Sequence, residues 1–84
     1  MRLDLALKHS GLLKRRVVAK LYCEKGLVKV NHKVGKPSSD VKDGDLIEVT
    51  LGNKIVQFYI SIRQEGRKIY LGYELVEENK PVDA

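Results

Sequence analysis

Positive charge is concentrated where residues 14–16 read Lys-Arg-Arg and Lys20 follows four residues after Arg16. Residues four apart share one face of a helix, so a helix here would present Arg16 and Lys20 together. Guanidinium groups bind phosphate through paired hydrogen bonds and can stack on unpaired bases. An ordinary solvated helix face is the alternative. The chemistry that this stretch allows is binding of a polyanion.

No group of residues in the sequence suggests catalysis. His9 and His32 have no cysteine or carboxylate cluster at metal-ligand spacing, and Cys23 has no histidine near it in the sequence. We interpret Cys23 as a partly buried structural thiol. The acidic residues 40–48 lack the spacing of a calcium loop and fit a turn that leads into a strand. We expect a non-enzymatic protein with no catalytic residues, metal or cofactor.

Charge is unevenly divided along the 84 residues. Residues 1–42 contain 11 Lys/Arg and 3 Asp/Glu, a net charge of +8, whereas residues 43–84 contain 5 and 8, a net charge of −3. A basic half joined to an acidic half in one small domain suggests a face for a polyanion. Lysines that serve only solubility are the alternative, and charge alone does not separate the two.

The chain is short enough for a single domain and has no apolar run of about 18 residues that could cross a membrane. Asp4 and Lys8 interrupt its first apolar stretch, which argues against a secretory signal. Its single cysteine excludes an internal disulfide framework. We expect a monomer in the reducing cytoplasm, with no membrane partner.

Apolar spacing predicts two N-terminal helices. The first contains Leu3, Ala6 and Leu7 and ends at Ser10-Gly11. The second runs from about residue 14 to residue 25 and stops at Gly26.

At 100° per residue, the apolar side chains of the second helix fall in one arc. Arg16 and Lys20 fall on the opposite side, with Arg15 on a flank. The residues expected to pack inward are Val17, Val18, Leu21 and Tyr22.

After Gly26 the apolar period changes from about 3.6 to 2. Residues 27–30 alternate and lead into a hairpin turn at Asn31, and strand candidates follow at residues 46–51, 54–62 and 68–76. The faces expected to be apolar are Val56, Phe58, Ile60 and Ile62 in one strand and Ile69, Leu71, Tyr73 and Leu75 in the next. The pattern predicts an α+β domain, with two helices followed by a small antiparallel sheet of about four strands.

The loop of residues 31–39 adds lysines and small polar side chains, which commonly contact phosphates and 2′-hydroxyl groups. Hairpin loops are polar in any case, so both interpretations stay open. The aromatic residues have core-like spacing, and a base-stacking sheet is not predicted.

Residues 2–49 resemble the S4 RNA-binding domain family. The shared motifs are R-L-D near the start, K-R-R-x-x-A-K in the second helix, G-x-V-x-V-N, K-P-S and V-x-x-G-D, in that order. The resemblance implies an αL-type S4-like fold, in which two helices and a short sheet present a basic groove to structured RNA. We expect an S4-type RNA-binding domain at residues 1–50 and a C-terminal strand extension of the same domain at 51–76. The polar residues 77–84 predict a flexible tail.

The resemblance also implies which residues bind. Asp4 matches the family aspartate, whose implied role is to orient an arginine. Gly11 stands where relatives commonly have arginine, and His32 replaces the usual glycine of the hairpin turn. The RNA-binding residues predicted from the motifs and the loop together are Arg2, Lys14, Arg15, Arg16, Lys20, Asn31, Lys33, Lys36 and Ser38.

The chain is most similar to small bacterial family members that act in ribosome-associated quality control. This implies binding to rRNA and tRNA on large ribosomal subunits obstructed by peptidyl-tRNA, in support of alanine tailing by an RqcH-like elongation factor. A second hypothesis is a heat-shock-type recycling or assembly factor that binds rRNA. A third is a protein-interaction module that uses the strand edge of the C-terminal half.

Overall fold

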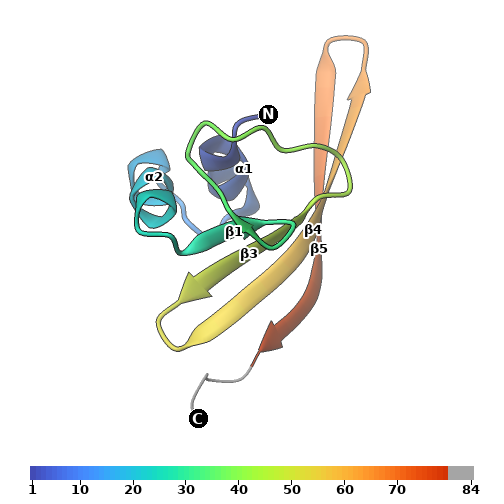
Figure 1. Ribbon diagram of the computed structural model, residues 1–84. Helices are drawn as coiled ribbons and strands as arrows, with labels where there is room; N and C mark the ends of the chain where they lie inside the picture. The colour runs from blue at the N-terminus through green and yellow to red at the C-terminus, as the bar shows by residue number, and fades with distance from the viewer. Residues whose placement is uncertain (80–84) are drawn as a thin grey trace.

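The computed structural model describes residues 1–79, in which two helices pack on part of a five-stranded antiparallel sheet (Figure 1). The elements are α1 (Leu3–Ser10), α2 (Arg16–Glu24), β1 (Val28–Val30), β2 (Lys33–Val34), β3 (Leu46–Leu51), β4 (Lys54–Glu65) and β5 (Lys68–Asn79). The strands lie in the order β2-β1-β3-β4-β5. The predicted α+β class is confirmed, with one strand more than expected because the hairpin after β1 closes on the two-residue β2.

Helix α1 follows its apolar spacing. Leu3, Ala6 and Leu7 are fully buried in the core, as predicted. Gly11 ends the helix in the left-handed conformation, at φ 84°, and its N–H donates to the Lys8 carbonyl at 3.1 Å.

Helix α2 begins later than predicted and turns a different face inward. Arg15 is extended, with φ −113°, so Arg16 is the first helical residue. Val17 and Leu21 are 75% and 46% exposed, so their predicted inward packing is wrong. The buried residues are Ala19 and Cys23.

The half-buried Val18 and Tyr22 flank that inward face and pack against the core, as predicted. Arg16, Ala19 and Cys23 are spaced three and four apart, so they share one side of α2. Arg16 therefore lies on the side that meets α1 and not opposite it, which corrects the predicted placement of this arginine.

The inner face of β4 matches its pattern. Val56, Phe58 and Ile60 are buried and Ile62 is half-buried. Phe58 also meets Tyr73 of β5 edge to face, with ring centroids 5.7 Å apart.

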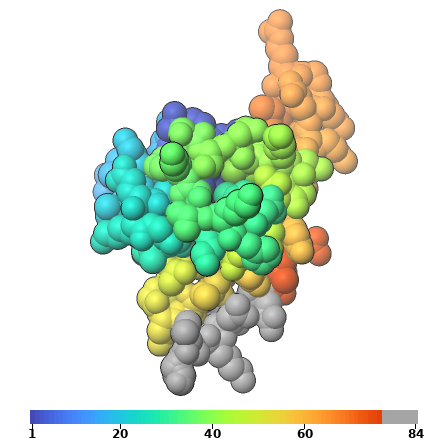
Figure 2. All heavy atoms as spheres, viewed as in Figure 1, coloured from blue at the N-terminus to red at the C-terminus, as the bar shows by residue number. Residues whose placement is uncertain are grey.

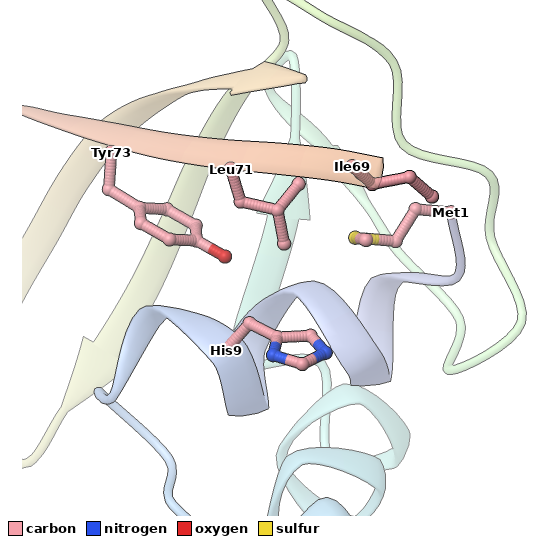
Figure 3. A pocket seen from close by; sticks show the side chains of 5 residues that line it. All are labelled: Met1, His9, Ile69, Leu71 and Tyr73. Atoms are coloured by element: carbon pink, nitrogen blue, oxygen red, sulfur yellow. The ribbon is translucent and has the colours of Figure 1, made fainter. Parts of the chain in front are cut away.

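The predicted face of β5 is only partly covered. Ile69 is 55% exposed, because β4 and β5 continue as a hairpin that projects beyond the helices (Figure 2). Leu75, opposite Phe58 on the edge strand β5, is 59% exposed. Ile69, Leu71 and Tyr73 point from β5 toward α1, where His9 lies across a cavity of about 400 Å³ (Figure 3). The Tyr73 hydroxyl is buried there without a hydrogen-bond partner among residues 1–79, and burial raises its pKa.

Strand β5 continues to Asn79, three residues into the segment predicted to be a flexible tail, and pairs there with Ile55–Gln57 of β4. The flexibility of that tail stays a prediction. Residues 80–84 lie outside the described part of the chain.

The β1–β2 turn places two residues in the left-handed region, Asn31 at φ 50° and His32 at φ 71°. This is the geometry of a two-residue turn that glycine usually completes. His32 Nδ1 lies 3.0 Å from Oε1 of Glu48 in β3, a contact that glycine could not make.

The acidic residues after the loop form a turn that leads into β3, as predicted, and two of them accept backbone hydrogen bonds. Asp45 Oδ2 accepts from the Lys42 N–H at 2.9 Å, and Asp43 Oδ1 accepts from the Ile62 N–H at 2.7 Å. Among residues 1–79, no three histidine, cysteine or acidic side chains are grouped as metal ligands would be.

Gly35→Ala tests the contact between the loop and α1. A Cβ at residue 35 would lie 2.5 Å from Cδ2 of the fully buried Leu3 and 3.4 Å from Cγ2 of Val30. Because Leu3 has no space into which to move, we expect a loss of about 1–3 kcal/mol of unfolding free energy, measured by urea denaturation.

Gly72→Ala is the matched control, because its Cβ would meet the hydroxyl of the exposed Ser61 at 2.6 Å, and that side chain can rotate. Equal destabilisation by both variants would contradict the role given to the Gly35–Leu3 approach.

Candidate nucleic-acid interface

Asp4 is a buried carboxylate, 1% exposed, that binds two arginines. Its Oδ1 accepts from Arg2 Nε at 3.2 Å, and its Oδ2 accepts from Arg2 Nη2 at 3.3 Å and from Arg16 Nε at 3.2 Å. The backbone N–H of Leu5 donates to Oδ1 at 2.8 Å. Asp4 therefore orients arginines, the role that the family resemblance implies.

Burial would raise the pKa of Asp4, but hydrogen bonds and charge from Arg16 and Arg2 outweigh it and hold the pKa below its ordinary value of 3.8. The carboxylate is therefore ionised at neutral pH. With two guanidinium groups around one carboxylate, the cluster keeps a net charge of +1.

The arginines remain available to a ligand. The side chain of Arg2 is 49% exposed and that of Arg16 is 48% exposed. A guanidinium has five N–H donors, and Asp4 engages two from Arg2 and one from Arg16. The remaining donors suit the oxygens of a phosphate.

The loop after β2 is fastened to the start of α1. The N–H groups of Leu3 and Asp4 donate to the carbonyls of Ser39 and Pro37 at 2.8 and 3.1 Å, which satisfies donors that a helix start leaves free. Ser39 Oγ accepts from the Lys36 N–H at 2.8 Å and closes the turn. Arg2, which precedes α1, is thereby held next to residues 36–39.

These attachments form a groove of about 540 Å³ between α2 and the loop, which lie side by side in Figure 2. We call it the basic groove. It brings together four predicted RNA-binding residues from three segments: Arg2, Lys20, Lys36 and Ser38. The other lining residues are Cys23, Glu24, Val34, Gly35 and Pro37.

The remaining predicted residues lie elsewhere. Lys14 and Arg15 are exposed just before α2, and Lys33 is exposed on β2. Asn31 has a structural role, because its Nδ2 donates to Asp45 Oδ1 at 3.1 Å and its Oδ1 accepts from the Leu46 N–H at 3.0 Å. Its amide is thus engaged at both ends within the protein.

Two residues that shape the loop were not among the predicted RNA-binding residues. Gly35 lines the groove and lets the backbone approach Leu3, and Ser39 closes the turn through its hydroxyl. The K-P-S-S sequence contains the turn signal, since serine hydroxyls commonly bond nearby backbone groups.

Cys23 lies at the floor of the groove and is 3% exposed. Burial, with the negative charges of Asp4 and Glu24, raises the pKa of the thiol to about 11. The thiol is therefore protonated at neutral pH and is a poor nucleophile, in line with the predicted structural role.

Residues 1–47, which include the arginine cluster and the basic groove, match the family model of the S4 domain. The RQC P-site tRNA stabilizing factor of Listeria innocua is 47% identical over 68 residues, which cover 81% of this chain and 74% of that protein. The factor of the same name from Bacillus subtilis is 44% identical over 61 residues, covering 73% and 71% of the two chains.

The fold is similar to that of a solved trimeric structure, Heat Shock Protein 15 of Vibrio cholerae. The TM-score is 0.74 at 26% identity, and the match covers 90% of this chain and 81% of that one. The likeness extends beyond residues 1–47 into the β4–β5 hairpin. No helix within residues 1–79 is long and apolar enough to cross a bilayer.

Asp4→Asn tests the arginine cluster. Because the carboxylate is buried and holds two cations, we expect a loss of about 2–4 kcal/mol of unfolding free energy at pH 7. The lowered pKa of Asp4 stabilises the fold above the ordinary value of 3.8, and that stabilisation is lost as pH falls through the folded-state pKa. The stabilities of wild type and variant should therefore converge in acid.

Asp40→Asn is the control, because the Asp40 side chain is 66% exposed and, within residues 1–79, binds only the N-terminal amine, at 3.1 Å. It should cost less than about 1 kcal/mol. Chemical denaturation from pH 7 to pH 3 measures both, and a constant difference between wild type and Asp4→Asn would refute the electrostatic role of Asp4.

Proposed function

This chain belongs to the S4 domain family, and we propose that it binds rRNA and tRNA together on large ribosomal subunits obstructed by peptidyl-tRNA. The observation that carries the proposal is the pair of half-exposed arginines fixed by Asp4 beside the basic groove. Basic side chains held in place before RNA arrives lose little freedom on binding, which favours affinity.

Binding is electrostatic in this proposal. Arg2, Arg16, Lys20 and Lys36 each neutralise a phosphate, and the hydroxyl of the exposed Ser38 serves phosphate or 2′-hydroxyl groups. Lys14, Arg15 and Lys33 extend the basic surface at its margin. Four neutralised phosphates give a plot of log affinity against log salt with a slope of roughly −3.

The biological role follows the curated relatives, whose name describes stabilisation of the P-site tRNA in RQC. In this role the chain is a non-enzymatic, monomeric cytoplasmic factor that holds the peptidyl-tRNA in place. An RqcH-like elongation factor then adds alanine to the stalled chain. The high identity to these factors over most of the chain supports this role.

Recycling or assembly of the large subunit after heat shock is the second candidate. The similarity to Heat Shock Protein 15 favours it, because that match covers most of both chains. That protein is trimeric in its structure, which raises self-association as an alternative to the monomer.

A protein-interaction module is the third candidate. Strand β5 is an edge of the sheet, with Leu75 and Val76 59% and 45% exposed. Such an edge can accept a strand from a partner. Salt-insensitive binding to a protein would favour this candidate over both RNA-binding roles.

Arg16→Ala tests the proposed function. Tagged protein is recovered from bacteria, and the copurifying large subunits and peptidyl-tRNA are quantified. We expect recovery to fall several-fold, because the variant loses a phosphate contact and its Asp4 keeps a single arginine partner. In purified binding assays the salt slope should become shallower by about 1.

Arg16→Lys separates charge from geometry, since lysine retains the positive charge but lacks the planar guanidinium that can bind a phosphate through two parallel hydrogen bonds. It should recover part of the binding. Equal recovery of subunits by wild type and Arg16→Ala would sink the assignment of Arg16, and absence of subunits with either protein would sink the ribosomal function.

A further inference from the structure

The end of the β4–β5 hairpin projects away from both helices (Figures 1 and 2). Strand β3 begins at Leu46, which pairs with Tyr59 of β4. From Ile60 toward the hairpin end, β4 therefore has only residues 43–45 along that edge. Every residue from 63 to 70 is exposed. The molecule measures 47 × 24 × 21 Å, and the hairpin runs along its long dimension.

The hairpin end is ordered by its own contacts. Glu65 pairs with Lys68, so the loop has two residues, and Gly66 takes φ 63° at the first of them. A glycine there suits the tight turns that match strand twist. Gln64 Nε2 donates to the Gly66 carbonyl at 3.3 Å.

Strand register places three of its side chains on one face. Arg63 lies opposite Tyr70, and Lys68 is two residues from Tyr70, so all three point the same way. The neighbouring Ile69 and Leu71 point toward α1, which means that the face of Arg63, Lys68 and Tyr70 points away from it (Figure 3).

The polar side chains of the hairpin end make few contacts within the protein. The Arg63 side chain is 77% exposed, and its ion pair with Glu65 is long, at 3.7 Å. Within residues 1–79, the side chains of Arg67 and Lys68 have no hydrogen-bond or ion-pair partner. Tyr70 is 47% exposed. Like charges crowded at a narrow end repel, which favours an anionic ligand.

A hollow of about 440 Å³ adjoins Tyr70 and Arg63 on this face. Gly72 has no side chain and lies opposite the small Ser61, so little side-chain volume fills the hollow at this pair. Asp43 also lines the hollow, with Oδ1 held by the Ile62 N–H. The hollow leaves room for a planar group against the exposed tyrosine ring.

We propose that Arg63, Arg67, Lys68 and Tyr70, which we call the hairpin-tip surface, form a second RNA contact. The cations hold phosphates, and Tyr70 stacks on an unpaired base beside the hollow. RNA fits better than protein because residues 63–68 contain three cations and one acid, a net charge of +2 that attracts a phosphate backbone. The inference builds on the proposed function by adding a contact that is separate from the basic groove.

The first test is the double variant Arg67→Ala/Lys68→Ala, titrated over a series of KCl concentrations. Two probes are used: purified large ribosomal subunits and protein-free rRNA extracted from them. We expect binding to both to weaken roughly three- to tenfold and the salt slope to become shallower by about 1–2. Glu65→Ala is the control, since removal of the tip's negative charge should strengthen binding.

The second test compares Tyr70→Ala with Tyr70→Phe. The alanine variant should bind both RNA probes roughly fivefold or more weakly at an unchanged salt slope, and phenylalanine should restore binding because stacking needs no hydroxyl. Thermal unfolding verifies that each variant is folded.

The outcomes separate this inference from the proposed function. If wild type binds subunits and the tip variants match it in affinity and slope, the hairpin-tip contact is wrong and the proposed function stands. If wild type binds protein-free rRNA but not subunits, and the tip variants weaken that binding, the contact stands and the ribosomal function falls. Weaker binding to subunits alone would assign the hairpin-tip surface to a protein partner and overturn the RNA contact.

Discussion

The buried carboxylate of Asp4 is the constraint on which the binding surface depends. It lies in the first turn of α1 and holds Arg16, the first residue of α2, so one ionised group fixes the starts of both helices relative to each other. The backbone N–H of the same residue binds the Pro37 carbonyl, which holds the loop in place as well. Helix, helix and loop therefore meet at a single residue.

This arrangement reconciles stability with a surface built for an anion. Clustered cations repel, and the carboxylate offsets part of that repulsion while the guanidinium groups stay half exposed. The side of α2 that carries Arg16 is buried at the small residues Ala19 and Cys23. The protein thus holds its arginines in place before any ligand binds. The larger exposed residues Val17 and Leu21 are left outside the core.

Much of the fold could be predicted from the periodicity of apolar residues alone, because α1 and the inner face of β4 bury the residues that this spacing indicates. The inward face of α2 could not, since the apolar arc through Val17 and Leu21 outweighs the small Ala19 in any count of hydrophobicity. Period 2 also places Ile69 and Leu75 on one face of β5 without showing that little covers it. The basic and polar residues of the groove could be predicted from their residue types. Their proximity in space could not, because it depends on backbone hydrogen bonds from α1 to the carbonyls of residues 37 and 39, which sequence spacing does not reveal.

In the proposed function, the arginines bind RNA while Asp4 still holds them. A high-resolution cryo-EM map of this chain on a large ribosomal subunit carrying peptidyl-tRNA tests it most directly. We expect the guanidinium groups of Arg2 and Arg16 to lie within hydrogen-bond distance of RNA phosphates, with Asp4 still accepting from both. A map in which the arginines face solvent, or leave Asp4 to reach the RNA, would contradict it.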